Sequence, residues 1–184
     1  LYAIVGATHP DLLRSEGEAY RTGLVARVRR LGIQNHVQFV DRFVGRVELT
    51  RWLEGADVFL TPYPDLNQIV SGTMSYAMGA GRAVVSTPYA YAAELLADGR
   101  GMLVPPGSPA DLANALTRVL GDNELRASLG RRAYDHSRPM VWSAVGDEYR
   151  RLFAKVTGNA RRTLPGGALA GVGLAALAVA LATL

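Results

Sequence analysis

Two short apolar runs, Val58–Leu60 and Ala83–Val85, constrain the fold of this chain more than any other feature. Between them lie a proline-containing loop, the small-residue cluster Ser71–Thr73 and a segment with helical character that ends at Gly79. Two parallel strands need a crossover of about a dozen residues or more, usually helical and right-handed. The interval is long enough to supply one, so this stretch predicts a strand, a loop, a helix and a second, parallel strand.

The same alternation of apolar runs and helical patterns extends over most of the chain. Ser108, Pro109 and Asp111 supply a hydroxyl N-cap, a proline at the first helical position and a carboxylate at the third, which together indicate a helix start. The alternation predicts an α/β fold with a doubly wound, Rossmann-like parallel sheet. Strands are expected near residues 2–5, 37–40, 58–60, 83–85 and 101–104, and helices near 20–31, 49–53, 109–119, 124–134 and 141–156, with one more that ends at 79.

Composition excludes several classes of protein. The chain is 49% apolar and 20% charged, as in an ordinary globular protein, and it has no cysteine for a disulfide, a thiolate nucleophile or a metal ligand. Its net charge of +4 comes from arginines spread along the expected helices. This spread favours solvated helix faces, with a surface for anionic lipid or an acidic partner as the alternative, and it disfavours nucleic-acid binding.

The two ends of the chain differ from its middle. Residues 1–6 resemble a buried strand already in progress, so residues 1–158 are expected to form an N-terminally incomplete domain. Residues 159–184 form an Ala/Gly/Leu-rich tail without charge after Arg161–Arg162. Its length is sufficient for a membrane segment, but a poorly ordered extension explains the composition as well. The expected location is the cytoplasm, at the inner face of a membrane if the tail binds lipid.

The start of the helix that ends at Gly79 is the predicted ligand site. In parallel α/β units, ligands lie outside the carboxyl ends of the strands, where the unpaired N–H groups of the crossover helix point outward. The amides around Ser71–Thr73 therefore suit a phosphate. An N-capped helix without any ligand is the alternative.

Several short motifs occur in a characteristic order along residues 1–156. Together they resemble the C-terminal, donor-binding half of retaining group 1 nucleotide-sugar glycosyltransferases with the GT-B architecture. The motifs are Val5-Gly6, Val37-Gln38-Phe39, Ala56-Asp57-Val58 before Pro62, residues 77–87, Glu94-Leu95-Leu96 and residues 98–104.

The resemblance implies an enzyme that binds a nucleotide diphosphate sugar and transfers the sugar, with retention, to a hydroxyl acceptor. It implies no required metal or other cofactor, a glycan or lipid-linked acceptor, and a missing N-terminal acceptor domain, without which this piece is expected to be inactive. The donor would lie between two Rossmann-like domains, with its diphosphate on the amides at the start of the helix. The implied donor-binding residues are Gly6, Thr8, Arg42, Phe43, Gln68, Ile69, Val70, Ser71, Gly72, Thr73 and Tyr76.

The chain departs from this family at two positions. Gln68 and Tyr76 stand where the family usually carries two glutamates, and neither can accept a proton as a carboxylate does. Tyr76 fits equally well as a core aromatic, Arg42 as an exposed residue and Phe43 as a packing residue. No catalytic residue is assigned within the chain.

Two other functions compete with the transferase. A catalytically degenerate glycosyltransferase-like scaffold or membrane-associated interaction module would explain Gln68, Tyr76 and the apolar tail. A nicotinamide-dependent dehydrogenase is disfavoured because Gly79-Ala80-Gly81 ends a helix, whereas a dinucleotide fingerprint opens one. The three histidines have no neighbouring ligand set, so no metal site is predicted.

Overall fold

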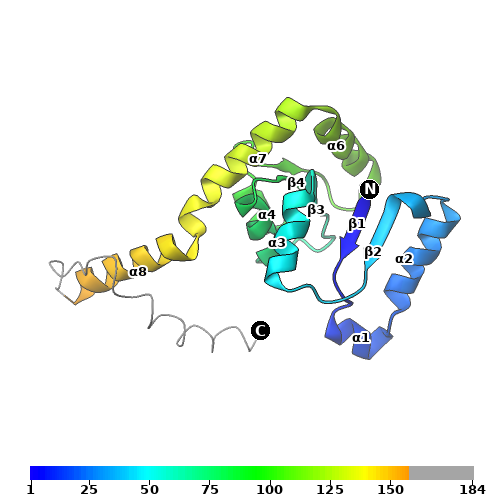
Figure 1. Cartoon of the computed structure of the whole chain (residues 1–184), viewed down its shortest axis with the longest axis horizontal. Helices are drawn as coiled ribbons and strands as arrows, with labels where there is room; N and C mark the ends of the chain where they lie inside the picture. Colours follow the sequence, from blue (N-terminus) through cyan, green and yellow to red (C-terminus); the bar gives the residue numbers. More distant parts are fainter. Residues whose placement is uncertain (158–184) are drawn as a thin grey trace. The chain divides into compact units, whose positions relative to one another are not determined.

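The computed structural model describes residues 1–157 (Figure 1). The chain divides into two compact units, Leu1–Asp135 and His136–Leu184. The predicted tail, residues 159–184, lies outside the described residues, and so does the end of the predicted domain at residue 158.

The first unit alternates strands and helices, as predicted. Its strands are β1 (Tyr2–Val5), β2 (Val37–Val40), β3 (Val58–Thr61), β4 (Ala83–Ser86) and β5 (Met102–Leu103). Its helices are α1 (Pro10–Glu16), α2 (Ala19–Arg30), the 3-10 turn η1 (Gln34–His36), α3 (Arg46–Gly55), α4 (Gly72–Gly79), α5 (Ala90–Leu95), α6 (Pro109–Gly121) and α7 (Asn123–Ser137), whose last two residues belong to the second unit.

All strand pairs are parallel, which confirms the predicted fold class. The strands form a two-stranded sheet, β1-β2, and a three-stranded sheet in the order β3-β4-β5. Tyr2 pairs with Val37 in the first sheet, and Val58 pairs with Ala83 in the second. The sheet predicted from the alternation is therefore present in two pieces.

The core of the first unit covers both faces of the three-stranded sheet. Because side chains alternate along a strand, Val84 packs into one buried cluster, with residues of α3, α4 and α5. Ala83 and Val85 pack into a second cluster, with residues of α6 and α7. Helices on both faces of a parallel sheet define the doubly wound arrangement. By contrast, α1 and α2 contain no buried residue.

Two local features differ from the expectation. Helix α1 was not predicted; it ends where Gly17 adopts a φ of +61° and its N–H donates to the carbonyl oxygen of Leu13, whereas α2 matches the helix predicted near residues 20–31. Such a φ is favourable only for glycine. Helix α5 was not predicted, since its six residues are too few for a helical period to be recognised.

Helix α7 approaches the backbone before β4 very closely. A Cβ atom at Gly130 would overlap the carbonyl oxygen of Gly81 and would lie 3.7 Å from the amide nitrogen of Ala83. Gly81 itself adopts a φ of +68° in the turn after α4. Glycine at position 130 therefore sets how tightly α7 packs on the three-stranded sheet.

After the last two residues of α7, the described part of the second unit contains η2 (Arg138–Met140) and α8 (Trp142–Val156). Helix α8 has 15 residues, and none of its side chains is buried. Within residues 1–157, no helix has both the length and the apolar character needed to cross a membrane.

Candidate functional site

Ser71 starts helix α4 as its N-cap. Its backbone is extended, with φ −142° and ψ 98°, and its hydroxyl accepts a hydrogen bond from the amide of Met74 at 3.3 Å. Serine is among the preferred N-cap residues because its oxygen satisfies one amide that the helix leaves without a carbonyl partner. This hydrogen bond fixes the residue at which the loop ends and α4 begins.

The next two amides, of Gly72 and Thr73, stay at the surface. Both residues are exposed, and no hydrogen bond within residues 1–157 uses either amide. A Cβ atom at Gly72 would meet nothing within 4 Å. The amino end of α4 is therefore open in this chain, and its amides and helix dipole favour an anion.

The opposite side of α4 is firmly anchored in the core. Met74, Ala77 and Met78 are fully buried. The hydroxyl of Tyr89 lies 3.8 Å from the sulfur of Met74, and the hydroxyls of Ser75 and Tyr91 are 2.7 Å apart. These contacts fix the direction in which the open end of α4 points.

A buried polar cluster holds the loop that leads from β3 to α4. Thr61 and Ser86 are the last residues of β3 and β4. The hydroxyl of Thr61 donates to that of Ser86 at 2.9 Å, and the hydroxyl of Ser86 donates to the carbonyl oxygen of Thr61. The hydroxyl of Thr87 donates to the carbonyl oxygen of Tyr63 at 2.6 Å. Sequence reasoning missed these residues, and the only signal was their polarity at the ends of apolar runs.

The remaining predicted residues around α4 lie at the surface. The side-chain nitrogen Nε2 of Gln68 donates to the carbonyl oxygen of Val70 at 2.8 Å, which leaves the side-chain oxygen Oε1 available as an acceptor. Ile69 and Val70 are exposed. The side chain of Tyr76 is 45% exposed, so it is not a core aromatic.

Arg21 connects the loops that follow β1 and β2. Its guanidinium donates to the carbonyl oxygen of Gly6 at 2.7 Å and to the hydroxyl of Thr8 at 3.3 Å. It also pairs with Asp41 at 3.1 Å and with Glu18 at 3.4 Å. Gly6 and Thr8 are thus held in place by a residue that the sequence did not distinguish from the other arginines.

Arg42 forms a two-pronged ion pair with Glu48, the first acidic residue of α3. One nitrogen of its guanidinium lies 2.7 Å from a carboxylate oxygen of Glu48, and the second nitrogen contacts the other oxygen. These hydrogen bonds hold the pKa of Glu48 below its usual value and raise the pKa of Arg42. Phe43, the next residue, is 84% exposed and packs on no core cluster.

We predict that the carboxyl group of Glu48 titrates below the ordinary range for glutamate. Because its pKa is lowered in the folded chain, the pair contributes stability above the unfolded pKa and loses it as the pH falls through the folded pKa. NMR titration of the Glu48 carboxyl carbon measures this value. In Arg42→Gln the midpoint should rise toward the ordinary glutamate value, and an unchanged midpoint would show that the pair does not persist in solution.

The predicted donor-binding residues therefore form two groups. Gln68, Ile69, Val70, Gly72, Thr73 and Tyr76 are exposed around the start of α4, and Ser71 among them is buried. The residues after β1 and β2 form the other group, joined through Arg21. Among residues 1–157, no hydrogen bond or ion pair of these side chains joins the two groups.

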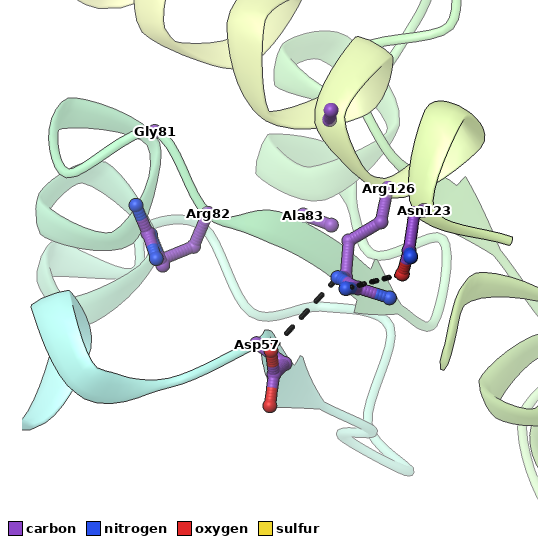
Figure 2. Close-up of a pocket in the computed structure, with 7 residues that line it drawn as sticks. Asp57, Gly81, Arg82, Ala83, Asn123 and Arg126 are labelled. Atoms are coloured by element: carbon purple, nitrogen blue, oxygen red, sulfur yellow. Dashed lines mark hydrogen bonds and ion pairs between the residues drawn. The ribbon is translucent and has the colours of Figure 1, made fainter. Parts of the chain in front are cut away.

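A small pocket of about 180 Å³ lies at the opposite ends of the strands (Figure 2). It is lined by Asp57 and Arg82, which precede β3 and β4, and by Arg126 of α7. Arg126 donates to the carbonyl oxygens of Val119 and Leu120 at the end of α6 and lies 3.9 Å from Asp57. Arg82 likewise donates to the backbone carbonyl oxygens of Ala80 and Ala56. The two arginines that line the pocket therefore hold neighbouring chain segments together, which is a structural role.

No group of three metal-ligating side chains occurs within the part of the chain that the structure describes. The chemistry that the surface around α4 offers is hydrogen bonding by amides and hydroxyls, together with the positive pole of a helix.

Comparison with known proteins shows the family. The profile of the family described as "Glycosyl transferases group 1" matches residues 4–122. A D-inositol 3-phosphate glycosyltransferase of Catenulispora acidiphila is 34% identical over 131 residues, which are 70% of this chain and 30% of that protein. The chain thus spans about a third of the length of this curated relative.

Solved structures show the same fold. The C-terminal domain of the group 1 glycosyl transferase LpcC from Francisella tularensis has a TM-score of 0.61 and 21% identity, over 73% of this chain and 66% of that one. Anabaena HepE, solved in complex with UDP and glucose, has a TM-score of 0.69 and 20% identity, over 84% of this chain and 40% of that one. The chain therefore belongs to the group 1 glycosyl transferases and has the Rossmann-like fold of the C-terminal half of their GT-B architecture.

Proposed function

We propose that this chain is the donor-binding part of a glycosyltransferase that moves a sugar, with retention, from a nucleotide diphosphate to a hydroxyl acceptor. The diphosphate lies on the amides of Gly72 and Thr73, with the hydroxyl of Thr73 as a further donor. The observation that carries the proposal is the open amino end of α4, because Gly72 has no neighbour that a side chain would meet within 4 Å.

The energies are adequate for an anionic ligand. A hydrogen bond to a charged group contributes about 1.5–3 kcal/mol, and the helix dipole adds about 0.3–1 kcal/mol. Arg42 is the guanidinium that the proposal assigns to the diphosphate, and it must exchange Glu48 for a phosphate in order to contribute. The complex of HepE with UDP and glucose is consistent with a nucleotide ligand for this fold.

Transfer of the sugar develops negative charge on the departing diphosphate. Fixed amides at a helix end stabilise such charge without reorganising during the reaction. In this proposal the amides and a guanidinium suffice, and the chain requires no metal or other cofactor. Gln68 accepts a hydrogen bond from a sugar hydroxyl through its amide oxygen, and the exposed Tyr76 contacts the ribose. The acceptor is held by protein beyond this chain.

Calorimetry with a panel of nucleoside diphosphates in the presence of a chelator tests the proposal. We expect one of UDP, GDP, ADP or CDP to bind more tightly than the others, and the matching monophosphate to bind less tightly because it lacks the second phosphate. Absence of binding by every diphosphate, or binding that appears only when a divalent cation is added, would contradict it.

A binding module without catalysis is the second candidate, favoured by Gln68 and Tyr76 where the family has carboxylates. The two functions differ in turnover. A polypeptide that joins this chain to an acceptor domain should release nucleoside diphosphate from its sugar donor if it is a transferase. Tight donor binding without any release would favour the module.

A further inference from the structure

Arg21 is a nearly buried cation in a chain whose arginines mostly lie at the surface. It belongs to the first turn of α2, and its side chain is 14% exposed. Its nitrogen Nη1 is buried without a hydrogen-bond partner among residues 1–157. Burying a cation is costly, and a buried donor without an acceptor adds to that cost. A solvated helix face therefore does not explain this residue.

The other two nitrogens of the guanidinium hold the segments that follow β1 and β2. Nη2 donates to the carbonyl oxygen of Gly6 at 2.7 Å, and Nε lies 3.3 Å from the hydroxyl oxygen of Thr8. Nε also lies 3.1 Å from a carboxylate oxygen of Asp41. Gly6 and Thr8 follow β1, whereas Asp41 follows β2. One side chain thus ties together the segments after two paired strands.

The backbone joins the same two segments at one further point. The amides of Gly6 and Arg42 both donate to the carbonyl oxygen of Val40, each at 3.0 Å. Arg42 comes directly after Asp41, and its side chain is exposed. The position of Arg42 at the surface therefore depends on a carboxylate that Arg21 holds.

We propose that Arg21 is a positioning residue for the donor site. Its guanidinium fixes the two loops relative to each other, and the loops present Thr8 and Arg42 to the nucleotide. Because Arg21 is nearly buried, it acts on a ligand only through them. Lysine cannot replace it, since an ammonium group is a point charge on a flexible stem and lacks the fixed fork of donors that reaches both loops. This inference rests on the proposed function.

Two matched substitutions in α2 test the role. Arg21→Lys keeps the charge but loses the fork, while Arg27→Lys makes the same change at an exposed position of the same helix. Calorimetry with the nucleoside diphosphate that wild type prefers should show binding at least about tenfold weaker in Arg21→Lys, the scale of loss when the outer support of a binding site is removed. Arg27→Lys should stay within about twofold of wild type, because substitutions at exposed positions change little.

Hydrogen exchange gives a readout that needs no ligand. In Arg21→Lys the amides of Gly6 and Arg42 should exchange faster, because the segments that carry them lose the support of the guanidinium. The amide of Val85, which is buried in β4, should keep its wild-type rate. Local loosening of the two loops would thereby be separated from a general loss of stability.

Chemical rescue provides a second variant. Arg21→Ala leaves space for a small cation near both loops, and methylguanidinium at millimolar concentration should restore binding of the diphosphate. Methylammonium at the same concentration should not, since it carries the charge without the planar fork. Circular dichroism sets a temperature at which each variant is folded.

The outcomes separate this inference from the proposed function. A wild-type chain that binds no nucleoside diphosphate would overturn both. Binding by wild type with equally tight binding by Arg21→Lys would overturn the positioning role alone. Faster exchange of Val85 together with the loop amides would assign Arg21 a general role in stability. Unchanged exchange of the loop amides, or rescue by methylammonium, would likewise overturn the positioning role.

Discussion

Substitution of Gly130 by alanine should destabilise the first unit strongly, although alanine is the better helix former. The helix propensity of alanine favours the substitution by about 1 kcal/mol. The added methyl group, however, would overlap the carbonyl oxygen of Gly81, and this backbone atom cannot rotate away as a flexible side chain does. Overpacking of a core costs about 1–3 kcal/mol or more, so we expect a net loss of about 2 kcal/mol in the free energy of unfolding.

Chemical denaturation followed by circular dichroism measures this change. Gly23→Ala in α2 is the matched control, because a Cβ atom there meets nothing within 4 Å. The control should stabilise the chain or leave it unchanged, by up to about 1 kcal/mol. If Gly130→Ala were as stable as wild type, α7 would not pack on the turn at Gly81 in solution.

The fold was predictable because its main signals are local. Short continuous apolar runs identify the strands, Ser108 followed by Pro109 identifies the start of a helix, and the intervals between runs are long enough for crossovers. Helix α1 was missed because its seven residues are too few for a helical period to be recognised. The division into two sheets was also missed, because an apolar run identifies a strand but not the strands that pair with it in a sheet.

The candidate site was predictable only where it depends on sequence neighbours. Ser71 caps the helix that follows it, and this requires no tertiary information. The partners of Arg42 and Gly6 are different. Glu48 lies six residues after Arg42 and Arg21 fifteen after Gly6, and no local motif singles out either pair among the chain's many arginines and acidic residues. Only the packing of α2 and α3 selects the pairs that form.

The diphosphate site proposed at Gly72 leads to the second large effect. Gly72→Asp would place a carboxylate at the first position of α4, where the diphosphate is proposed to lie. Loss of a charge-assisted hydrogen bond, together with repulsion between like charges, should weaken binding of the preferred nucleoside diphosphate by about 2–4 kcal/mol, or roughly 30- to 1000-fold. Calorimetry should therefore detect little or no binding.

The same carboxylate should have the opposite effect on the fold. A negative charge in the first turn of a helix is stabilising by about 0.3–1 kcal/mol, and no neighbour within 4 Å opposes a side chain at Gly72. The melting temperature of Gly72→Asp should thus be equal to or above that of wild type while its affinity falls. Gly72→Ala, which adds the Cβ atom without charge, separates crowding from repulsion and should retain most of the binding. If Gly72→Asp bound nucleoside diphosphate as tightly as wild type, the amides at the start of α4 would not be the diphosphate site.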